Sequence, residues 1–225
     1  MREWATKALA GMPLAESDYG YLLGRGARPD TIHGLGISTW VPPKEPAPDE
    51  AFRKKYGSRG EFFNDRILFP LWSARGLLIG WESRHAGQKD LSRYIIPKWH
   101  WQTHWLGMPL AMPRMWEGKV VWICEGVFDL FALNQALPNS PVLAIGTARL
   151  HRGQVRFLSR LALGGVRLAL DRDKAGREGT EKALYYLEKA GVECKDHPYG
   201  PGKDPGEIWD SSGLRGCEKA FPLAA

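Results

Sequence analysis

Acidic side chains follow two apolar runs of the sequence, at the point where each run stops. Residues 120–124, Val-Val-Trp-Ile-Cys, lead into Glu125, and residues 168–170, Leu-Ala-Leu, lead into Asp171 and Asp173. Apolar runs of this kind are typical of buried parallel strands, whose carboxyl ends meet at one edge of a sheet. Hard divalent cations prefer carboxylate oxygens. The pattern therefore predicts a Mg²⁺ or Mn²⁺ site formed by Glu125, Asp171 and Asp173.

Phosphoryl transfer is the chemistry that such a cluster favours. Three or four carboxylates repel one another unless divalent ions neutralise them, and paired metals stabilise the attacking and leaving oxygens of an in-line displacement. Gly126 and Gly176 permit tight turns where phosphates approach the backbone. Asp129, four residues after Glu125, is a further candidate catalytic acid. Asp129 and Asp173 each also suit an alternative role as a helix cap.

Strand-like and helix-like stretches alternate after residue 118. Expected strands cover residues 119–124, 141–146, 165–170 and 192–199, and expected helices cover residues 128–137, 152–163 and 175–190. This alternation predicts an α/β fold, a parallel sheet with right-handed crossovers and flanking helices. Ligands bind such sheets at the carboxyl ends of the strands. Gly146 and Thr147 fall at the same edge as the acids.

The first half of the chain predicts different elements. Residues 1–40 favour short helices, and residues 41–50, with four prolines, favour an exposed connector. Residues 66–72 and 77–84 flank the turn Ser73-Ala-Arg-Gly76 and predict an antiparallel hairpin. We therefore expect a mixed α+β subdomain ahead of the parallel sheet.

Basic residues are concentrated in the middle of the chain. Residues 52–98 hold ten Lys and Arg against four Asp and Glu, an excess equal to the formal net charge of +6 for the whole chain. A basic surface either keeps a protein soluble or, beside a carboxylate site, attracts nucleic acid. Arg93 and Lys98 are candidate ligands for nucleic acid or nucleotide in this segment.

Three tryptophans, Trp99, Trp101 and Trp105, lie within seven residues. Indoles that stack on bases contribute about 1–3 kcal/mol per base. The alternative is that these side chains cover the seam between two subdomains, since large aromatic residues most often serve packing. The sequence leaves both interpretations open.

The cysteines and the apolar runs indicate a cellular compartment. Cys124, Cys194 and Cys217 are far apart and form no Cys-x-x-Cys pair, so neither a disulfide framework nor a zinc ribbon is indicated. This usage fits a reducing environment. No apolar run reaches the length of a signal-peptide core or a membrane span. We expect a cytoplasmic protein without a membrane partner.

The acidic motifs resemble those of a known module. Glu125-Gly-Val-Phe-Asp129 resembles the Glu-Gly-x-x-Asp motif of Toprim domains, and Asp171-Arg-Asp173 resembles their Asp-x-Asp motif. Toprim domains are the metal-binding module of bacterial-type primases, topoisomerases and some nucleases. Residues 145–148, Ile-Gly-Thr-Ala, are similar to the Gly-Thr-Ala strand end of the primase branch.

The resemblance to primases extends beyond the Toprim motifs. Residues 66–71, Arg-Ile-Leu-Phe-Pro-Leu, and residues 76–80, Gly-Leu-Leu-Ile-Gly, are similar to the primase-specific basic subdomain. Tyr21-Leu22-x₂-Arg25-Gly26 resembles its helical lead-in. The resemblance covers roughly residues 15–210, and the ordered set of motifs is far more specific than any one of them.

The resemblance implies the catalytic core of a bacterial-type (DnaG-type) DNA primase, with a mixed basic subdomain over residues 1–117 and a Toprim subdomain with a C-terminal tail over residues 118–225. It implies metal-dependent synthesis of short RNA primers from NTPs on a single-stranded DNA template. The resemblance assigns four catalytic acids, Glu125, Asp129, Asp171 and Asp173, of which all but Asp129 would also hold metal. It assigns Asp204 as one further metal ligand. The groups that would hold nucleotide or template are Arg66, Arg84, Gly146 and Thr147.

Two departures from the family pattern keep alternatives open. The acidic stretch Asp-Pro-Asp of primases is Asp204-Pro-Gly206 here, with Glu207 as a displaced substitute. Zinc-binding and helicase-binding modules are not visible, so we expect a replicative helicase or a separate template-recognition module as partner, as for a phage- or plasmid-encoded core. The alternatives are a non-catalytic primase-like protein that binds DNA or nucleotide, and a Toprim nuclease.

Overall fold

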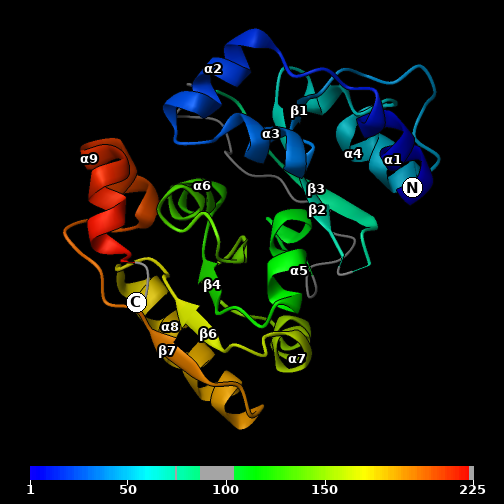
Figure 1. The fold of residues 1–225 in the computed structure, drawn as a ribbon. Coiled ribbons are helices and arrows are strands. Elements are labelled where there is room, and N and C mark those ends of the chain that lie inside the picture. The colour runs from blue at the N-terminus through cyan, green and yellow to red at the C-terminus, as the bar shows by residue number, and fades with distance from the viewer. Residues whose placement is uncertain (74, 87–103, 223–225) are drawn as a thin grey trace.

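The computed structural model describes residues 1–73, 75–86 and 104–222, which form two sheets surrounded by helices (Figure 1). The antiparallel sheet has the strand order β1 (Ser38–Thr39), β2 (Ile67–Trp72), β3 (Leu78–Arg84). The parallel sheet has the strand order β5 (Val142–Ala144), β4 (Val121–Cys124), β6 (Val166–Leu168), β7 (Cys194–Asp196). The expected α/β fold, a parallel sheet preceded by a mixed α+β part, is confirmed.

Short helices dominate the start of the chain, and those within residues 1–40 were predicted from the sequence. The short helices are α1 (Arg2–Ala10), α2 (Glu16–Gly24), α3 (Pro29–Leu35), α4 (Glu50–Tyr56) and the 3-10 turn η1 (Glu61–Phe63). Pro29 occupies the first turn of α3, where its missing N–H costs nothing. Asp49 caps α4 by accepting a hydrogen bond from the Phe52 N–H at 2.7 Å. Residues 41–49 hold neither helix nor strand, in agreement with the proline-rich connector.

The predicted hairpin is formed by β2 and β3, which pair antiparallel with an irregularity between Leu71 and Trp72. Both strands are buried except at their last residues, because each face of the hairpin is covered. Helix α6 (Val127–Ala136) covers one face. The other face is covered by an aromatic cluster that contains Trp40, Phe52, Tyr56 and Phe63. As a consequence, the polar residues Glu82 and Ser83 of β3 are buried.

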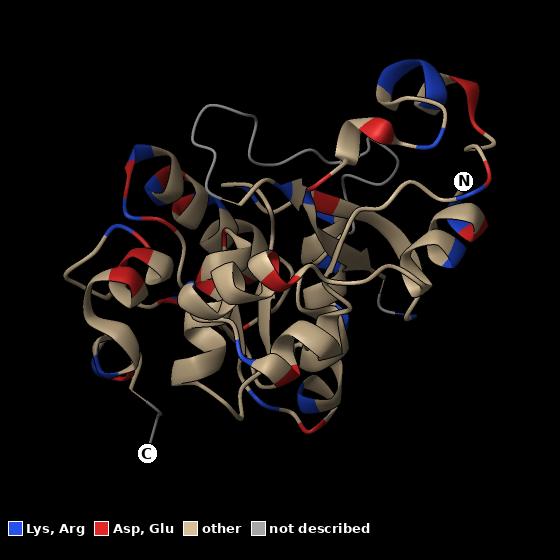
Figure 2. Ribbon diagram, turned by 90° about the horizontal axis from the view of Figure 1, so that it is seen from above, with Lys and Arg blue, Asp and Glu red and all other residues tan. Residues whose placement is uncertain are grey.

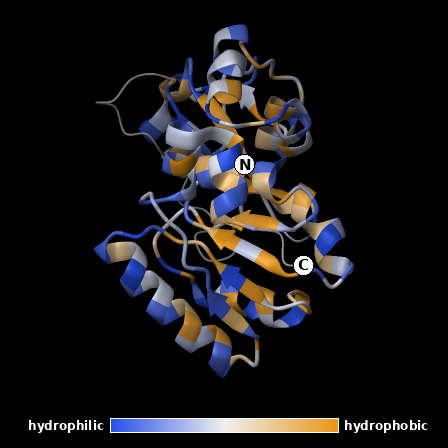
Figure 3. Cartoon of the chain, turned by 60° about the vertical axis from the view of Figure 1, so that its left-hand side comes forward, coloured by the Kyte–Doolittle hydropathy of each residue, from blue (hydrophilic) through white to orange (hydrophobic). Residues whose placement is uncertain are grey.

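Helices cover both faces of the parallel sheet. On one face the sheet packs with α5 (Met108–Trp116), α7 (Arg152–Leu161) and α8 (Lys174–Lys189), and on the other with α6 and α9 (Pro205–Ala220). Figure 3 shows hydrophobic strands in the interior and hydrophilic stretches on the outer helices. Helix α6 is buried on nearly all sides because it lies between the parallel sheet and the β2–β3 hairpin (Figure 1).

The alternating elements expected after residue 118 are all present, with ends that differ by a few residues from the expected ones. Three helices were not predicted, α4, α5 and α9. Helix α9 forms the tail of the chain and packs against α6, so residues of the tail share one core with residues of α2, α3 and the hairpin. The division of the chain after residue 117 stays a prediction.

Trp105 precedes α5 and is 1% exposed, with its ring centroid 5.4 Å from that of Phe157. The packing interpretation is therefore correct for this tryptophan. Trp99, Trp101, Arg93 and Lys98 lie outside the described residues. Among the helices of the described ranges, none has the length and apolar character needed to cross a bilayer.

Candidate active site

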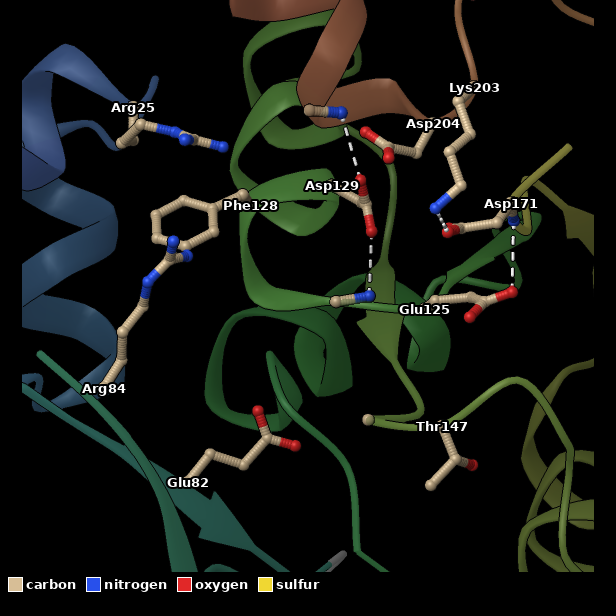
Figure 4. A pocket seen from close by; sticks show the side chains of 13 residues that line it. Arg25, Glu82, Arg84, Glu125, Phe128, Asp129, Thr147, Asp171, Lys203 and Asp204 are labelled. Atoms are coloured by element: carbon tan, nitrogen blue, oxygen red, sulfur yellow. Dashed lines mark hydrogen bonds and ion pairs between the residues drawn. The ribbon is translucent and has the colours of Figure 1, made fainter. Parts of the chain in front are cut away.

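The carboxyl ends of β4, β5 and β6 open into a pocket of about 360 Å³, which the antiparallel sheet and α2 close from the other side (Figure 4). The Toprim-like motifs supply Glu125, Asp129 and Asp171, and the loop before α9 adds Lys203 and Asp204. The opposite wall carries two arginines, a phenylalanine ring and one more acid, which are Arg25, Arg84, Phe128 and Glu82. The predicted acids therefore meet at one sheet edge, beside basic groups from the first subdomain.

Glu125 and Asp171 lie side by side at the ends of neighbouring strands β4 and β6. The Asp171 N–H donates a hydrogen bond to Glu125 Oε1 at 3.2 Å. Burial raises the pKa of Glu125 to about 7, and the negative charge of Asp171 acts in the same direction. Burial also raises the pKa of Asp171, while the nearby Lys203 ammonium opposes that shift. Two half-buried acids whose ionised forms are disfavoured are groups that a divalent cation would stabilise.

Lys203 bridges two of the acids that were predicted to hold metal. Its Nζ lies 3.0 Å from Asp171 Oδ2 and 3.2 Å from Asp173 Oδ2, and these contacts raise the pKa of Lys203. Asp173 is exposed and caps α8, where Oδ1 accepts a hydrogen bond from the Gly176 N–H at 2.9 Å, which lowers the pKa of Asp173. Within the described ranges, no three His, Cys, Asp or Glu residues are grouped so as to hold a metal ion. Glu125 and Asp171 fit a metal, but its entry beside Asp173 requires Lys203 to move.

We expect the substitution Lys203→Met to raise the affinity for Mg²⁺ roughly two- to thirtyfold, because the two partly exposed ion pairs of Lys203 are worth about 0.2–1 kcal/mol each. Calorimetric titration of Mg²⁺ and Mn²⁺ measures the change. Lys182→Met on the exposed side of α8 is the matched control and should leave the affinity unchanged. Weaker metal binding by Lys203→Met would mean that the lysine supports the metal site.

Asp129 joins the starts of α6 and α9. Its Oδ2 accepts a hydrogen bond from the Gly126 N–H at 2.8 Å, and its Oδ1 accepts one from the Gly206 N–H at 3.0 Å. The side chain is buried, and burial together with the charge of Asp204 raises its pKa well above the usual range. Both carboxylate oxygens accept hydrogen bonds from backbone N–H groups, so Asp129 connects the two turns that line the pocket. This geometry fits the alternative role of Asp129 as a helix cap.

The glycine that replaces an expected carboxylate lies at the first turn of α9. A side chain at Gly206 would place its Cβ 3.2 Å from Asp129 Oδ1 and 3.3 Å from Asp204 Oδ1, which is crowded. Asp204 caps α9 through the Glu207 N–H at 2.7 Å. Glu207, the displaced substitute, accepts a hydrogen bond from the Lys203 N–H and does not line the pocket. No acid takes the place of the missing carboxylate on this wall of the described pocket.

Two arginines approach the ring of Phe128 at the basic wall. The guanidinium carbons of Arg25 and Arg84 each lie 4.4 Å from the ring centroid (Figure 4). Arg25 also pairs with Asp210 at 3.1 Å. Arg25 was not predicted as a site residue, although it belongs to the motif that resembles the helical lead-in of primases. Arg66 does not line the pocket: it is 4% exposed, and its guanidinium lies 5.1 Å from the Phe62 ring centroid.

Gly146 and Thr147 line the pocket floor, where the sequence placed them. Gly146 has φ +72°, and a Cβ there would lie 2.4 Å from Oε1 of Glu82, so only glycine fits. The Thr147 hydroxyl bonds to the Arg149 carbonyl at 3.0 Å. Glu82 was missed from sequence, because only the tertiary contact between the hairpin and the β5 turn brings it here.

Comparisons with known proteins agree with this geometry. Residues 122–209 match the family model described as Toprim-like. A DNA primase from Treponema pallidum is 30% identical over 159 residues, 69% of this chain and 26% of that protein. One from Pseudomonas aeruginosa is 26% identical over 204 residues, 81% of this chain and 30% of that protein. The chain is similar to bacterial DNA primases and contains a Toprim-like segment.

Solved structures of DnaG primases have the same fold as this chain. The DnaG catalytic core superposes with a TM-score of 0.70 at 23% identity, covering 95% of this chain and 74% of that one. A DnaG primase catalytic domain bound to single-stranded DNA gives a TM-score of 0.71 at 22% identity, covering 95% of this chain and 73% of that one. The chain spans roughly a quarter to a third of the length of the curated relatives above.

Proposed function

We propose that the chain is the RNA-polymerase core of a DNA primase, which joins ribonucleotides into short primers on single-stranded DNA by metal-dependent nucleotidyl transfer. The observation that carries the proposal is the pocket itself. It places Glu125 and Asp171 opposite Arg25 and Arg84 across about 360 Å³, a volume in the range of small-molecule sites. Metal ligands on one wall and guanidinium groups on the other match the needs of a nucleoside triphosphate.

Each wall has a separate task in this mechanism. Glu125 and Asp171 would hold Mg²⁺ or Mn²⁺, which when bound neutralises the charge on the phosphate oxygens. Arg25 and Arg84 are positioned to contact phosphates through planar, permanently charged groups. Asp129 keeps the turns after β4 and before α9 in register, so the chain supplies mainly position and electrostatic stabilisation.

The template is proposed to run over the basic part of the first subdomain. Figure 2 shows the basic residues of α4 on one turn of that helix, and Lys54 and Lys55 are exposed there. The related DnaG catalytic domain was solved bound to single-stranded DNA. A protein acting in this way on replicating DNA would work in the cytoplasm together with a replicative helicase or a template-recognition module.

The affinity for single-stranded DNA is expected to fall steeply with salt. For single strands, the logarithm of the affinity falls by about 0.7 per phosphate contact for each tenfold rise in salt. The double substitution Lys54→Gln with Lys55→Gln should therefore reduce that slope by about 1.4. Fluorescence anisotropy at several salt concentrations measures it, with Lys182→Gln and Lys189→Gln on α8 as matched control. An affinity indifferent to salt would contradict the basic template path.

A primer-synthesis assay tests the proposed activity. Labelled NTPs, a single-stranded template and Mg²⁺ or Mn²⁺ should give short RNA oligomers, with and without a candidate helicase. Cleavage of DNA in the absence of NTPs would instead point to a Toprim nuclease. Nucleotide binding without product under all these conditions would support a non-catalytic primase-like protein, a candidate favoured by the Lys203 bridge across Asp171 and Asp173.

A further inference from the structure

Glu82 is an acid in the pocket that the proposed mechanism does not use. It lies on β3, is 2% exposed, and faces the pocket from the side opposite Asp129 and Asp204 (Figure 4). Its Oε1 has no hydrogen-bond partner in the described part of the chain. Burial raises the pKa of Glu82 to about 7. A buried carboxylate oxygen without a hydrogen-bond partner destabilises the fold. A ligand that brings hydrogen-bond donors to Glu82 would offset this cost.

The surroundings of Glu82 are fixed by backbone and rings. Its Oε1 lies against Gly146, and the His104 Nε2, 3.2 Å from the Ile145 carbonyl oxygen, borders the same point. Arg84, two residues along β3, directs its guanidinium to the Phe128 ring at 4.4 Å. Because Gly146 has no Cβ, the Glu82 carboxylate can lie directly against the turn after β5.

The charge of the neighbourhood decides which ligand Glu82 can take. A hard divalent cation needs about six oxygen ligands, and in the described ranges no group of three acids, histidines or cysteines is placed to hold one. Arg25 and Arg84 on the same wall also repel a cation. Neutral donors remain, and a carboxylate with two oxygens accepts well from two adjacent hydroxyl groups.

A nucleotide brings such a pair of hydroxyls to this position. Phosphates placed between the arginines and the edge formed by Glu125 and Asp171 would put the adjoining sugar in the same pocket of about 360 Å³, which Glu82 also lines. Acidic side chains recognise ribose hydroxyls in the same way in dinucleotide-binding folds.

We propose that Glu82 accepts hydrogen bonds from the 2′- and 3′-hydroxyls of the bound nucleotide and so selects ribonucleotides over deoxyribonucleotides. The proposal rests on the proposed function, because it assumes that a nucleotide occupies the pocket. It names ribonucleoside triphosphates as the substrate class. A site built to bond a hydroxyl rejects the analogue that lacks it more strongly than an apolar site rejects an isostere.

Equilibrium titration of ATP, 2′-deoxyATP and 3′-deoxyATP in the presence of Mg²⁺ tests the proposal. The unsubstituted protein should bind ATP roughly ten- to a hundredfold more tightly than either deoxy analogue, the range expected for bonds to a charged acceptor. Glu82→Ala should bring the three affinities within about threefold of one another, mainly by weakening ATP. Glu82→Gln keeps the size of the side chain and should give an intermediate preference.

Asp18→Asn is the matched control, since Asp18 is a buried acid elsewhere that accepts a hydrogen bond from the Thr39 hydroxyl at 2.6 Å. It should keep the full preference for ATP. Melting curves show whether each variant is folded, and Glu82→Gln serves if Glu82→Ala is not. Equal binding of ATP and 2′-deoxyATP by the unsubstituted protein, or an unchanged preference for ATP in Glu82→Ala, overturns the ribose assignment and leaves the proposed function standing. No binding of any nucleotide overturns both.

Discussion

Primer synthesis by the Glu125→Gln variant is expected to be about a thousandfold slower than that of the unsubstituted protein, a loss of about 4 kcal/mol of transition-state stabilisation. The glutamine keeps the shape of the side chain and can still accept from the Asp171 N–H. It removes the negative charge that a metal ion at the sheet edge requires. The rate of oligomer formation from labelled NTPs at saturating Mg²⁺ measures the effect.

Glu188→Gln, an exposed acid of α8, is the matched control and should retain the full rate. Nucleotide binding by Glu125→Gln is expected to change far less than the rate, because the arginine wall is intact. Asp171→Ala should be as impaired as Glu125→Gln, and the double variant should be little worse than either, since groups that act as a unit are not additive. A Glu125→Gln protein with normal turnover would remove Glu125 from the catalytic machinery.

Three strands of the parallel sheet, β4, β5 and β6, were predictable because they are almost fully buried, whereas β7 at the sheet edge is not. Residues 121–124, 142–144 and 166–168 are short, nearly continuous apolar runs, and a strand with two buried faces has no polar side to interrupt it. Two of the three missed helices have local reasons. Helix α5 contains Pro109 and Pro113, and α9 contains a break at Gly213 with a φ of +60°, so neither shows an uninterrupted helical pattern.

The residues of the site also differ in whether the sequence alone could place them. Acids that end a strand, such as Glu125 and Asp171, could be placed from sequence because the strand direction alone carries them to the sheet edge. Glu82 could not, since its burial depends on the hairpin meeting the turn after β5. Lys203 was equally hidden, because its bridge to Asp171 depends on where the loop before α9 returns to the sheet.

Stability, in contrast, is expected to depend most on Asp129. The substitution Asp129→Ala leaves the N–H groups of Gly126 and Gly206 without their acceptors, and each buried group left unpaired costs about 1–3 kcal/mol. Removing the carboxylate also removes the free-energy cost of burying it, the same cost that raises its pKa. This gain offsets part of the loss. We expect a net loss of about 3 kcal/mol in the free energy of unfolding and a fall of about 10 °C in melting temperature.

Asp204→Ala separates this effect from the loss of an ordinary cap. Asp204 caps the same helix, α9, through one hydrogen bond near the surface, so its removal should cost about 1 kcal/mol. Urea unfolding of both variants gives the two free energies on one scale. The difference between them measures what Asp129 adds by joining α6 to α9, because only Asp129 bonds to both helix starts. If Asp129→Ala were no less stable than Asp204→Ala, the contact between α6 and α9 would rest on its apolar packing, and the pocket walls would not need the buried acid.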